Sequence, residues 1–578
     1  MIEQIELCLA DGETMTVSPT RVNLVVGPNG AGKSLFLREL RDLLQTNGGL
    51  KTQLIAKINR CLPKDTKDMV DWLLDRGLLH DEESGAIYFP NFMPKKKTLL
   101  GRDRMNSEGP RKVGLDPLSL TINVGEPGRA LTTFLDGKTR LEVAEGGPYN
   151  SPAEVPDGCW SYLVQVDDDR GLLQNLVRQD LEYELYLDLN STPGTVVPRV
   201  TREALPPEFD ELTTSRELAS RYQQMNRLSD LSDGMQAYVG MLIASLVGHW
   251  RQLIIDEPEA FLHPPLARTL ARRLSTLAKE SNHTLWIATH SAEFLMGCIE
   301  AGVEVTVLRL GFAEGRARAN ILANDSLRAL FNDPLLRSSR VLQGLFHSAV
   351  VVAEGEYDRA FYDEINRRLL DEDTGCRDTL FVCAQGKNAV HRIARSVRQS
   401  GIPAAVIVDL DIIYSGWKKL LPELILDPEV RDVIEVQMKA AAAFTFELVP
   451  GSQKVRRVDI LTDEQQAQLR ALQEALMAFG VFVVLDGGLE SWLPELGVQE
   501  RARSKGQWVT QIFERLGADA NAEAYVRPTG DGVWGFMEAI GDWLREAQHL
   551  AGTWFWPREI DSAVSDTKDI PLPGDPAP

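Results

Sequence analysis

Two parts of the chain alternate short apolar runs with helical patterns. In the first part, the apolar run at 21–26 leads into a glycine-rich turn and then a helical pattern from Lys33 to Leu44. Three more apolar runs of strand length, with helical patterns between them, lie at Gln252–Ile255, Thr284–Ala288 and Val305–Leu310. This alternation predicts a doubly wound α/β sheet. The N-terminal segment alternates apolar with polar residues and carries acids early, which indicates a strand and not a signal peptide.

A second alternation of strands and helices begins near Ser348. It predicts another α/β domain with a parallel sheet, followed by a mostly helical C-terminal region. The expected strands are Ala349–Ala353, Thr379–Ala384, Ala404–Val408 and Val481–Leu485, and the expected helices between the first three are Tyr357–Leu370 and Asn388–Gln399.

Residues 51–210 differ from both parts, because they hold many glycines and prolines and show broken periodicity. We interpret them as an insertion into the first domain, with a strand at Trp160–Val166. The 578 residues are then expected to form a first domain at 1–340 with that insertion, a second domain at 345–500, a helical region at 501–566 and a tail at 567–578, whose proline and aspartate content predicts disorder.

Composition narrows the classes of protein that fit. The formal net charge of −21 argues against a protein that coats nucleic acid nonspecifically, because neutralising phosphates needs clustered Lys and Arg. It does not exclude a nuclease, because a metal site is itself built from carboxylates. No stretch approaches the roughly 20 apolar residues of a membrane helix. Six scattered cysteines without a C-x-x-C pair fit reduced thiols in the cytoplasm.

The glycine-rich turn after the first strand carries a phosphate-binding motif. Residues 27–34 (GPNGAGKS) fit G-x-x-x-x-G-K-[ST] between a strand and a helix. Backbone N–H groups of such a turn wrap phosphates at a helix N-terminus, while the lysine reaches the β- and γ-phosphates and the serine holds Mg²⁺. We therefore expect ATP and its Mg²⁺ to contact Asn29, Gly30, Gly32, Lys33 and Ser34.

Polar residues after later strands complete a candidate hydrolysis site. Asp256 and Glu257 end an apolar strand, where Asp256 can orient Mg²⁺ and Glu257 can polarise the attacking water. His290 follows the next strand, at the place of a γ-phosphate sensor. The segment 231–236 (LSDGMQ) precedes the acids and heads a helix.

With these motifs the first domain resembles ABC-type ATPases of the branch shared by SMC-like and recombination-mediator proteins. Residues 231–236 resemble the signature loop of that family, with Asp233 where glycine is usual. The resemblance implies that Ser232 and Gly234 cap ATP held by a second copy, and hence a homodimer or higher homo-oligomer through the heads. The glutamine loop of the family has two candidates here, Gln53 and Gln165.

Acidic residues follow two strands of the second domain. Glu354 and Asp358 come after the first of these strands, while Asp409 and Asp411 follow another and point the same way because they are two residues apart. If the two strands are neighbours, the acids converge at the C-terminal edge of the sheet. Their hard oxygen ligands suit Mg²⁺ or Mn²⁺. A candidate for a phosphate contact opens a helix at Gly386, Lys387 and Asn388.

The strand–acid–glycine–helix unit and the later D-x-D resemble the Toprim domain of topoisomerases, primases and some nucleases. Glu490, past the strand at Val481–Leu485, resembles the additional metal-site glutamate of the OLD (overcoming-lysogenization-defect) nucleases, which join an ABC head to a Toprim domain in this order. The resemblance covers most of the chain apart from the insertion. It implies two metal positions and a lysine that stabilises charge on the scissile phosphate. The residues so implied are Glu354, Asp409 and Asp411 for one ion, Asp358 and Glu490 for the second, and Lys505.

The ATPase motifs of the first domain and the acidic residues of the second together predict an ATP-gated, metal-dependent DNA endonuclease or nickase. Anti-phage defence is an implied role of such a protein. The alternative is a non-cleaving, ATP-switched DNA-binding or sensor module with the Toprim domain as scaffold. An SMC-like clamp would need long heptad repeats, which are missing. A topoisomerase would need a tyrosine nucleophile, and nothing marks Tyr357 or Tyr414 as one. The insertion is a candidate site for an accessory protein or RNA, and no membrane partner is expected.

Overall fold

The structure is a computed structural model that describes most of the chain. The described residues are 2–9, 14–45, 50–60, 79–81, 86–88, 132–149, 158–206, 209–247, 251–281, 283–313, 316–322, 340–414, 416–448, 454–456, 461–485, 487–498 and 505–550. The tail predicted at 567–578 lies outside these residues. The chain divides into two compact units, the first made of Met1–Val26, Gly30–Leu310 and Ile321–Arg328, and the second of the remaining residues.

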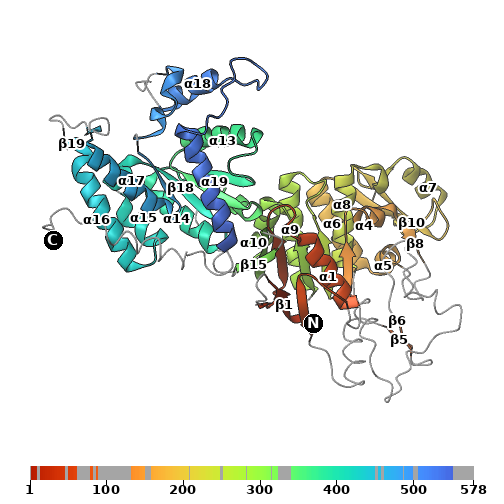
Figure 1. Cartoon of the computed structure of the whole chain (residues 1–578). Coiled ribbons are helices and arrows are strands. Elements are labelled where there is room, and N and C mark those ends of the chain that lie inside the picture. Colours follow the sequence, from red (N-terminus) through yellow and green to blue (C-terminus); the bar gives the residue numbers. More distant parts are fainter. Residues whose placement is uncertain are drawn as a thin grey trace. The chain divides into compact units, whose positions relative to one another are not determined.

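The centre of the first unit is formed by β14, β3, β13, β12 and β7, which belong to a six-stranded sheet with the order β15-β14-β3-β13-β12-β7. Figure 1 shows helices of this unit, among them α1, α8 and α9. Neighbouring strands from β14 to β7 pair in parallel. Parallel strands are covered on both faces, which is why β3 and β13 are apolar and buried along nearly their whole length. The strands are β3 (Val22–Val26), β7 (Thr132–Leu135), β12 (Gln252–Asp256), β13 (Thr284–Ala288), β14 (Val305–Ala313) and β15 (Arg316–Leu322).

Helices and smaller sheets surround this centre. The helix α1 follows β3 and packs on β12 and β13. The helices are α1 (Lys33–Gln45), α4 (Thr139–Glu142), α5 (Cys159–Gln165), α6 (Asp167–Leu181), α7 (Arg216–Gln223), α8 (Asp233–Leu246), α9 (Pro264–Glu280) and α10 (Ala292–Glu300). The antiparallel strands are β1 (Ile2–Cys8), β2 (Thr14–Val17), β4 (Ile55–Arg60), β5 (Leu79–Asp81), β6 (Ala86–Tyr88), β8 (Gly147–Pro148), β9 (Glu184–Asp188), β10 (Thr195–Thr201) and β11 (Asn226–Arg227).

Two expectations for the segment 51–210 differ from the structure. The strand expected at Trp160–Val166 is wrong, because α5 covers this segment. Its buried side chains include Trp160 and, three and four residues later, Leu163 and Val164, which is the spacing of a helix face. The segment also supplies β7, an edge strand of the central sheet, so it is not wholly an insertion. The pairing of β7 with β12 shows that β7 belongs to the central sheet.

The second unit contains a four-stranded parallel sheet in the order β17-β16-β18-β21. With the sheet of the first unit, it confirms the predicted α/β class with two parallel sheets. The strands and helices are β16 (Ala349–Ala353), α13 (Glu356–Asp371), β17 (Thr379–Cys383), α14 (Lys387–Gln399), β18 (Ala404–Asp409), α15 (Trp417–Leu424), α16 (Pro428–Phe444), β19 (Phe446–Leu448), β20 (Lys454–Arg456), α17 (Asp463–Met477), β21 (Val481–Val484), α18 (Lys505–Leu516) and α19 (Gly532–Leu550).

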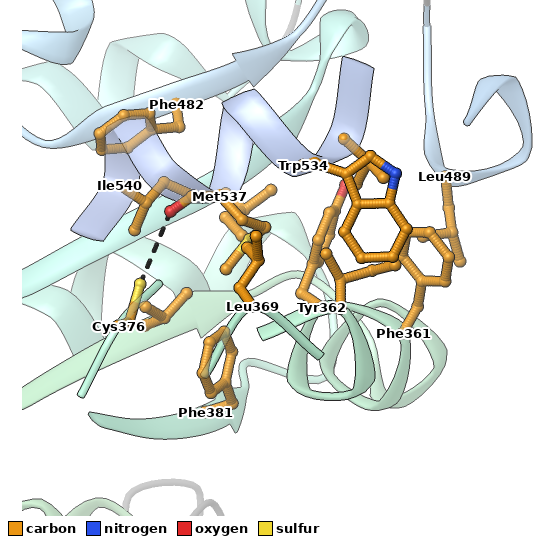
Figure 2. Packing of buried hydrophobic residues seen from close by; sticks show 14 of the residues in the cluster. Phe361, Tyr362, Leu369, Cys376, Phe381, Phe482, Leu489, Trp534, Met537 and Ile540 are labelled. Carbon is orange, nitrogen blue, oxygen red and sulfur yellow. Dashed lines mark hydrogen bonds between the residues drawn. The ribbon is translucent and has the colours of Figure 1, made fainter. Parts of the chain in front are cut away.

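A single hydrophobic core joins this sheet to α13, α18 and α19. Figure 2 shows Phe361 and Tyr362 of α13 among side chains of α19 and the sheet. Trp508 brings α18 into the same core, with its ring 5.4 Å from that of Phe361 in an edge-to-face arrangement. The buried Arg368 of α13 donates to the carbonyl oxygen of Leu516 at the end of α18. The core therefore fixes α18 against α13, next to the ends of the strands. Among the described residues, no helix is both long and apolar enough to cross a bilayer.

Candidate functional site

The phosphate-binding motif lies in the turn between β3 and α1. Gly30 and Gly32 have φ angles of 76° and 88°, a left-handed conformation that glycine adopts without a steric penalty. Asn29 is exposed in this turn, while Lys33 begins α1 with 6% of its surface exposed. The Ser34 hydroxyl donates to Asp256 Oδ1 at 3.1 Å. The turn thus holds two glycines in the left-handed conformation, and its serine meets the first acid of the later strand.

Asp256 and Glu257 stand where β12 ends, opposite the end of β13. Asp256 is the last residue of β12, and burial chiefly raises the pKa of its carboxyl group. Glu257 has a φ of 50°, which is uncommon for a residue with a side chain, and its amide donates to the Ala288 carbonyl at 2.9 Å. This conformation turns the chain sharply just after the sheet, and the exposed Glu257 side chain lies beside His290.

His290 is held between two glutamates. Its Nε2 lies 3.3 Å from Glu257 Oε1, and its backbone amide donates to Glu259 Oε1 at 2.6 Å. Burial lowers the pKa of His290, and the nearby charge of Lys33 lowers it further, so the imidazole is neutral at pH 7. Glu259 was not singled out in the sequence, although it is the third acid of the run D-E-P-E.

The residue before α8 and the first residue of that helix face the solvent. Ser232 and Asp233 are exposed, whereas Gly234 is buried. A Cβ atom on Gly234 would lie 2.4 Å from the Phe261 carbonyl oxygen, so only glycine allows this contact. Phe261 itself has 56% of its surface exposed and a φ of 72°. The start of α8 is therefore in direct contact with the turn that follows Glu257.

Arg140 of α4 supports the same turn from inside the protein, and no sequence motif points to this residue. It has 1% of its surface exposed, and its Nη1 donates to the Glu257 carbonyl at 2.7 Å and to the Asp256 carbonyl at 3.4 Å. Its guanidinium carbon lies 5.7 Å from the centre of the Phe261 ring. One buried side chain thus contacts the backbone of both acids and the ring beside Gly234.

The two glutamine-loop candidates occupy different places. Gln53 is exposed, its amide donates to Glu39 of α1 at 2.6 Å, and the next residue, Leu54, is the nearest side chain to Gly32. Gln165 ends α5, which packs against α6 and β8. The geometry favours Gln53, because it is adjacent to a residue that contacts the phosphate-binding turn.

The acidic residues of the second unit meet at the C-terminal edge of its sheet. Glu354 follows β16 and Asp409 ends β18, and these strands are neighbours. Glu354 Oε1 accepts a hydrogen bond from the Asp409 amide at 3.1 Å. Asp411 lies in the short helix 410–413 directly after β18. The condition that the sequence left open, adjacency of the two strands, is therefore met.

Lys505 lies among these carboxylates. Its Nζ is 2.8 Å from Asp358 Oδ1 and 3.5 Å from Asp409 Oδ2. Burial alone would lower the pKa of Lys505, but the charges of Asp409, Asp358 and Glu490 raise it, and the net direction is upward. The ammonium group is therefore charged, and it compensates Asp358, which has only 5% of its surface exposed.

The pKa of the Glu354 carboxyl group is raised in part by the negative charges around it. Burial first, and then the charges of Asp409, Asp411 and Asp358, raise its pKa to about 7. Gly488, which follows β21, lets the chain pass close to Asp409, since a Cβ atom there would lie 3.3 Å from Oδ2. The oxygen donors suit a hard cation. Among the described residues, however, no three Asp, Glu, His or Cys side chains are already arranged around one point as metal ligands.

The remaining residues considered in the sequence are the candidates for a phosphate contact at 386–388 and the two tyrosines. The amide of Gly386 already donates to the Glu354 carbonyl at 2.8 Å, so it is not directed toward a phosphate. Lys387 and Asn388 begin α14. The Tyr414 hydroxyl is hydrogen-bonded to Thr445. Tyr357 has 51% of its surface exposed, and its ring lies against Gly506.

Two family matches define the class of protein to which these sites belong. Residues 167–296 match the family described as "AAA domain, putative AbiEii toxin, Type IV TA system". Residues 345–411 match the family described as "Overcoming lysogenization defect protein-like, TOPRIM domain". The chain is therefore an ATPase head joined to a C-terminal Toprim domain. That Toprim domain is of the OLD-like kind, which confirms the resemblance found in the motifs.

The solved structures to which the chain is similar include two SMC heads and one transporter ATPase. The SMC head bound to the C-winged helix domain of ScpA is 13% identical, with 57% of this chain and 99% of that chain covered and a TM-score of 0.32. The SMC head domain from Thermotoga maritima is 13% identical, with 56% and 98% covered and a TM-score of 0.27. The protein cbiO1 from Clostridium perfringens, part of the ABC transporter complex cbiONQ, is 15% identical, with 59% and 95% covered and a TM-score of 0.27. No curated protein matches the chain.

Proposed function

We propose that this protein is an ATP-gated, divalent-metal-dependent DNA endonuclease or nickase that acts in the cytoplasm. The observation that carries the proposal is the meeting of Glu354, Asp409 and Lys505 at the C-terminal edge of the sheet in an OLD-like Toprim domain. Carboxylates with a charged lysine can bind both a cation and a phosphodiester. The ATPase head in the same chain supplies a nucleotide-dependent switch.

In this proposal the Toprim site cleaves a phosphodiester by attack of water on phosphorus. Mg²⁺, or Mn²⁺ in its place, would be held by Glu354, Asp409 and Asp411, with Asp358 and Glu490 as further ligands, and when bound it neutralises charge on the scissile phosphate. Lys505 donates from its ammonium group to a phosphate oxygen as negative charge develops there. The P–O bond to the leaving sugar oxygen breaks and leaves a nicked strand.

The head is proposed to hydrolyse ATP with the residues around β3, β12 and β13. Gly30 and Gly32 shape the turn around the phosphates, with Asn29 at its exposed side. Lys33 contacts the β- and γ-phosphates, while Ser34 and Asp256 hold Mg²⁺. Glu257 polarises the attacking water, and the neutral His290 senses the γ-phosphate. The hydrogen bond between Ser34 and Asp256 supports this assignment, because it brings the two proposed magnesium ligands together.

A second copy of the chain is the proposed partner of the head. Ser232 and Gly234 would cap the nucleotide of that copy, and the exposure of Ser232 and Asp233 leaves this loop accessible to it. ATP would then hold two heads together in a homodimer or a higher homo-oligomer. Hydrolysis would release them, and this cycle would gate the nuclease. DNA is the proposed substrate, anti-phage defence the proposed role, and an accessory protein or RNA a further proposed partner.

The test is cleavage of supercoiled plasmid by the full chain with Mg²⁺ or Mn²⁺, with and without ATP. We expect the wild type to nick or linearise the plasmid and Asp409→Ala to leave it intact, with cleavage reduced at least about 100-fold, as for loss of a principal charge-stabilising group. Lys33→Ala is expected to abolish the effect of ATP. The exposed Asp432 of α16 offers a matched control, since Asp432→Ala should cleave like the wild type.

Equal cleavage by the wild type and Asp409→Ala would contradict the proposal. Intact plasmid in every lane, together with nucleotide-dependent binding of DNA, would favour the alternative of a non-cleaving sensor with a Toprim scaffold.

A further inference from the structure

We propose that a basic face formed by α14 and α15 binds the phosphate backbone of DNA and guides the duplex to the acidic edge of the Toprim sheet. The basic face consists of the exposed Arg392 and Arg395 of α14 and the exposed Lys418 and Lys419 of α15, together with the half-buried His391. The inference rests on the proposed function and deepens it, because it names the surface that holds the substrate.

Positive charge is concentrated in this part of an acidic chain. The formal net charge of the chain is −21, yet residues 379–422 contain six lysines and arginines and only two acids, Asp409 and Asp411. Both acids belong to the proposed metal site. Arg398 is buried and donates to backbone carbonyl groups, so it does not contribute to the surface. A local excess of basic side chains is what the neutralisation of phosphates requires.

The packing of α14 beside α15 brings these charges onto one face (Figure 1). Arg395 Nη1 of α14 lies 2.5 Å from Glu423 Oε2 of α15. Arg392 lies one turn before Arg395, and Lys419 one turn before Glu423, so each pair shares a side of its helix. Burial lowers the pKa of the His391 imidazole, and Glu423 raises it. The charges of Lys419 and Arg392 lower it further, so both cations lie near this ring.

The cations of the basic face are accessible to a ligand. Arg392, Lys418 and Lys419 are exposed, and the Arg395 side chain is 51% exposed although it pairs with Glu423. A guanidinium group has five N–H donors, so Arg395 can donate to a phosphate while it keeps this partner. Glu423 offsets one of the four positive charges, and the face remains positive.

Both helices begin at the edge of the sheet where the acids meet. The amide of Gly386, directly before α14, donates to the Glu354 carbonyl at 2.8 Å. The helix α15 follows the short helix that contains Asp411. From Lys387, where α14 begins, to Arg395 the helix rises about 12 Å. This length corresponds to about three or four nucleotides of a strand. A backbone bound along the face would therefore bring its next phosphates to the acids.

The test is the salt dependence of DNA binding by the full chain, measured by fluorescence anisotropy of a labelled duplex over a series of KCl concentrations. Ca²⁺ is present to neutralise the acids. Each phosphate contact contributes roughly 0.9 to the slope of log affinity against log salt. Arg392→Ala/Lys419→Ala should therefore lower the slope by about two and weaken binding at least about 10-fold at low salt. The loss should be equal for two duplexes of unrelated sequence, because phosphates carry no sequence information.

A matched control changes the net charge by the same amount at exposed positions outside the basic face. Arg377 and Arg527 each pair with an acid on the surface of the same unit. Arg377→Ala/Arg527→Ala should keep the slope and the affinity of the wild type. Circular dichroism checks that both double variants are folded.

An unchanged slope and affinity in Arg392→Ala/Lys419→Ala would overturn this inference alone, provided that the wild type binds and cleaves DNA. An equal loss in the control pair would overturn it too, because the effect would then come from net charge and not from the face. Tighter binding of an RNA duplex of the same sequence would exclude DNA as the ligand of the face. A wild type that neither binds nor cleaves DNA would defeat the proposed function together with the inference.

Discussion

Glu257 adopts a left-handed backbone conformation, with a φ of 50°, at the point where the proposed catalytic carboxylate leaves the sheet. Such a conformation costs on the order of 1–3 kcal/mol and persists only where neighbouring groups enforce it. Here the Arg140 guanidinium binds the Glu257 carbonyl, and the Ala288 carbonyl accepts from the Glu257 amide. The side chain is thus aimed toward His290 by hydrogen bonds to its own backbone.

Arg140 is accordingly predicted to position Glu257 without touching the nucleotide. Arg140→Met keeps much of the side-chain volume but removes the hydrogen bonds to the two carbonyl groups. We expect the kcat of ATP hydrolysis to fall roughly 10-fold, about 1.4 kcal/mol in activation free energy, with little change in KM. Steady-state ATPase assays measure both constants. The exposed Arg178 serves as a control, since Arg178→Met should leave kcat unchanged, and an increase in KM alone for Arg140→Met would refute the positioning role.

Two helices of the head, α9 and α10, approach each other closely at a glycine. In α10, a Cβ atom on Gly297 would lie 2.2 Å from the carbonyl oxygen of Arg268 in α9. In α6, a Cβ atom on Gly171 would have no neighbour within 4 Å. The same residue type therefore has opposite consequences in the two helices, because one glycine is required by packing and the other only weakens its helix.

Replacement of each glycine by alanine separates these two effects. Gly297→Ala should lower the free energy of unfolding by about 1–3 kcal/mol, because the new methyl group forces α9 and α10 apart. Gly171→Ala should raise it by roughly 0.5–1 kcal/mol, because alanine loses less backbone entropy on folding. Urea unfolding followed by circular dichroism compares the two variants with the wild type. Shifts of the same sign in both would show that the α9–α10 contact is not as tight as described.

At the scale of the whole molecule, the proposed gating depends on ATP joining two heads. Glu257→Gln should bind ATP but hydrolyse it slowly, so the joined state accumulates. We expect ATP to raise the molar mass of this variant in multi-angle light scattering. Adding Ser232→Arg should prevent the increase, because a large charged side chain then meets the nucleotide of the second copy. ATP binding to its own turn should survive.

A control for this experiment lies on another exposed turn of the head. Thr192→Arg, in the turn between β9 and β10, adds the same side chain away from the loop before α8 and should not prevent the increase in mass. An unchanged mass of Glu257→Gln with ATP bound would argue against ATP-joined heads.

The sequence by itself determined the two α/β parts and most of the polar residues at their strand ends. Buried parallel strands are continuous apolar runs, so β13 and β16 were predicted with their observed bounds. Phosphate-binding turns need glycine and lysine at fixed spacing, which made Lys33 and Ser34 recognisable. In both cases the structural feature depends on a few residues that are neighbours in the sequence.

Only the tertiary structure decided which distant residues meet. Arg140 lies in a segment without clear periodicity and reaches Glu257 across 117 positions of the chain. Lys505 meets Asp358 because Trp508 and its neighbours bury α18 against α13. Such contacts depend on how the faces of helices and strands pack in three dimensions. The spacing of residues along the sequence does not predict them. The sequence therefore specified the chemical groups, and packing specified their partners.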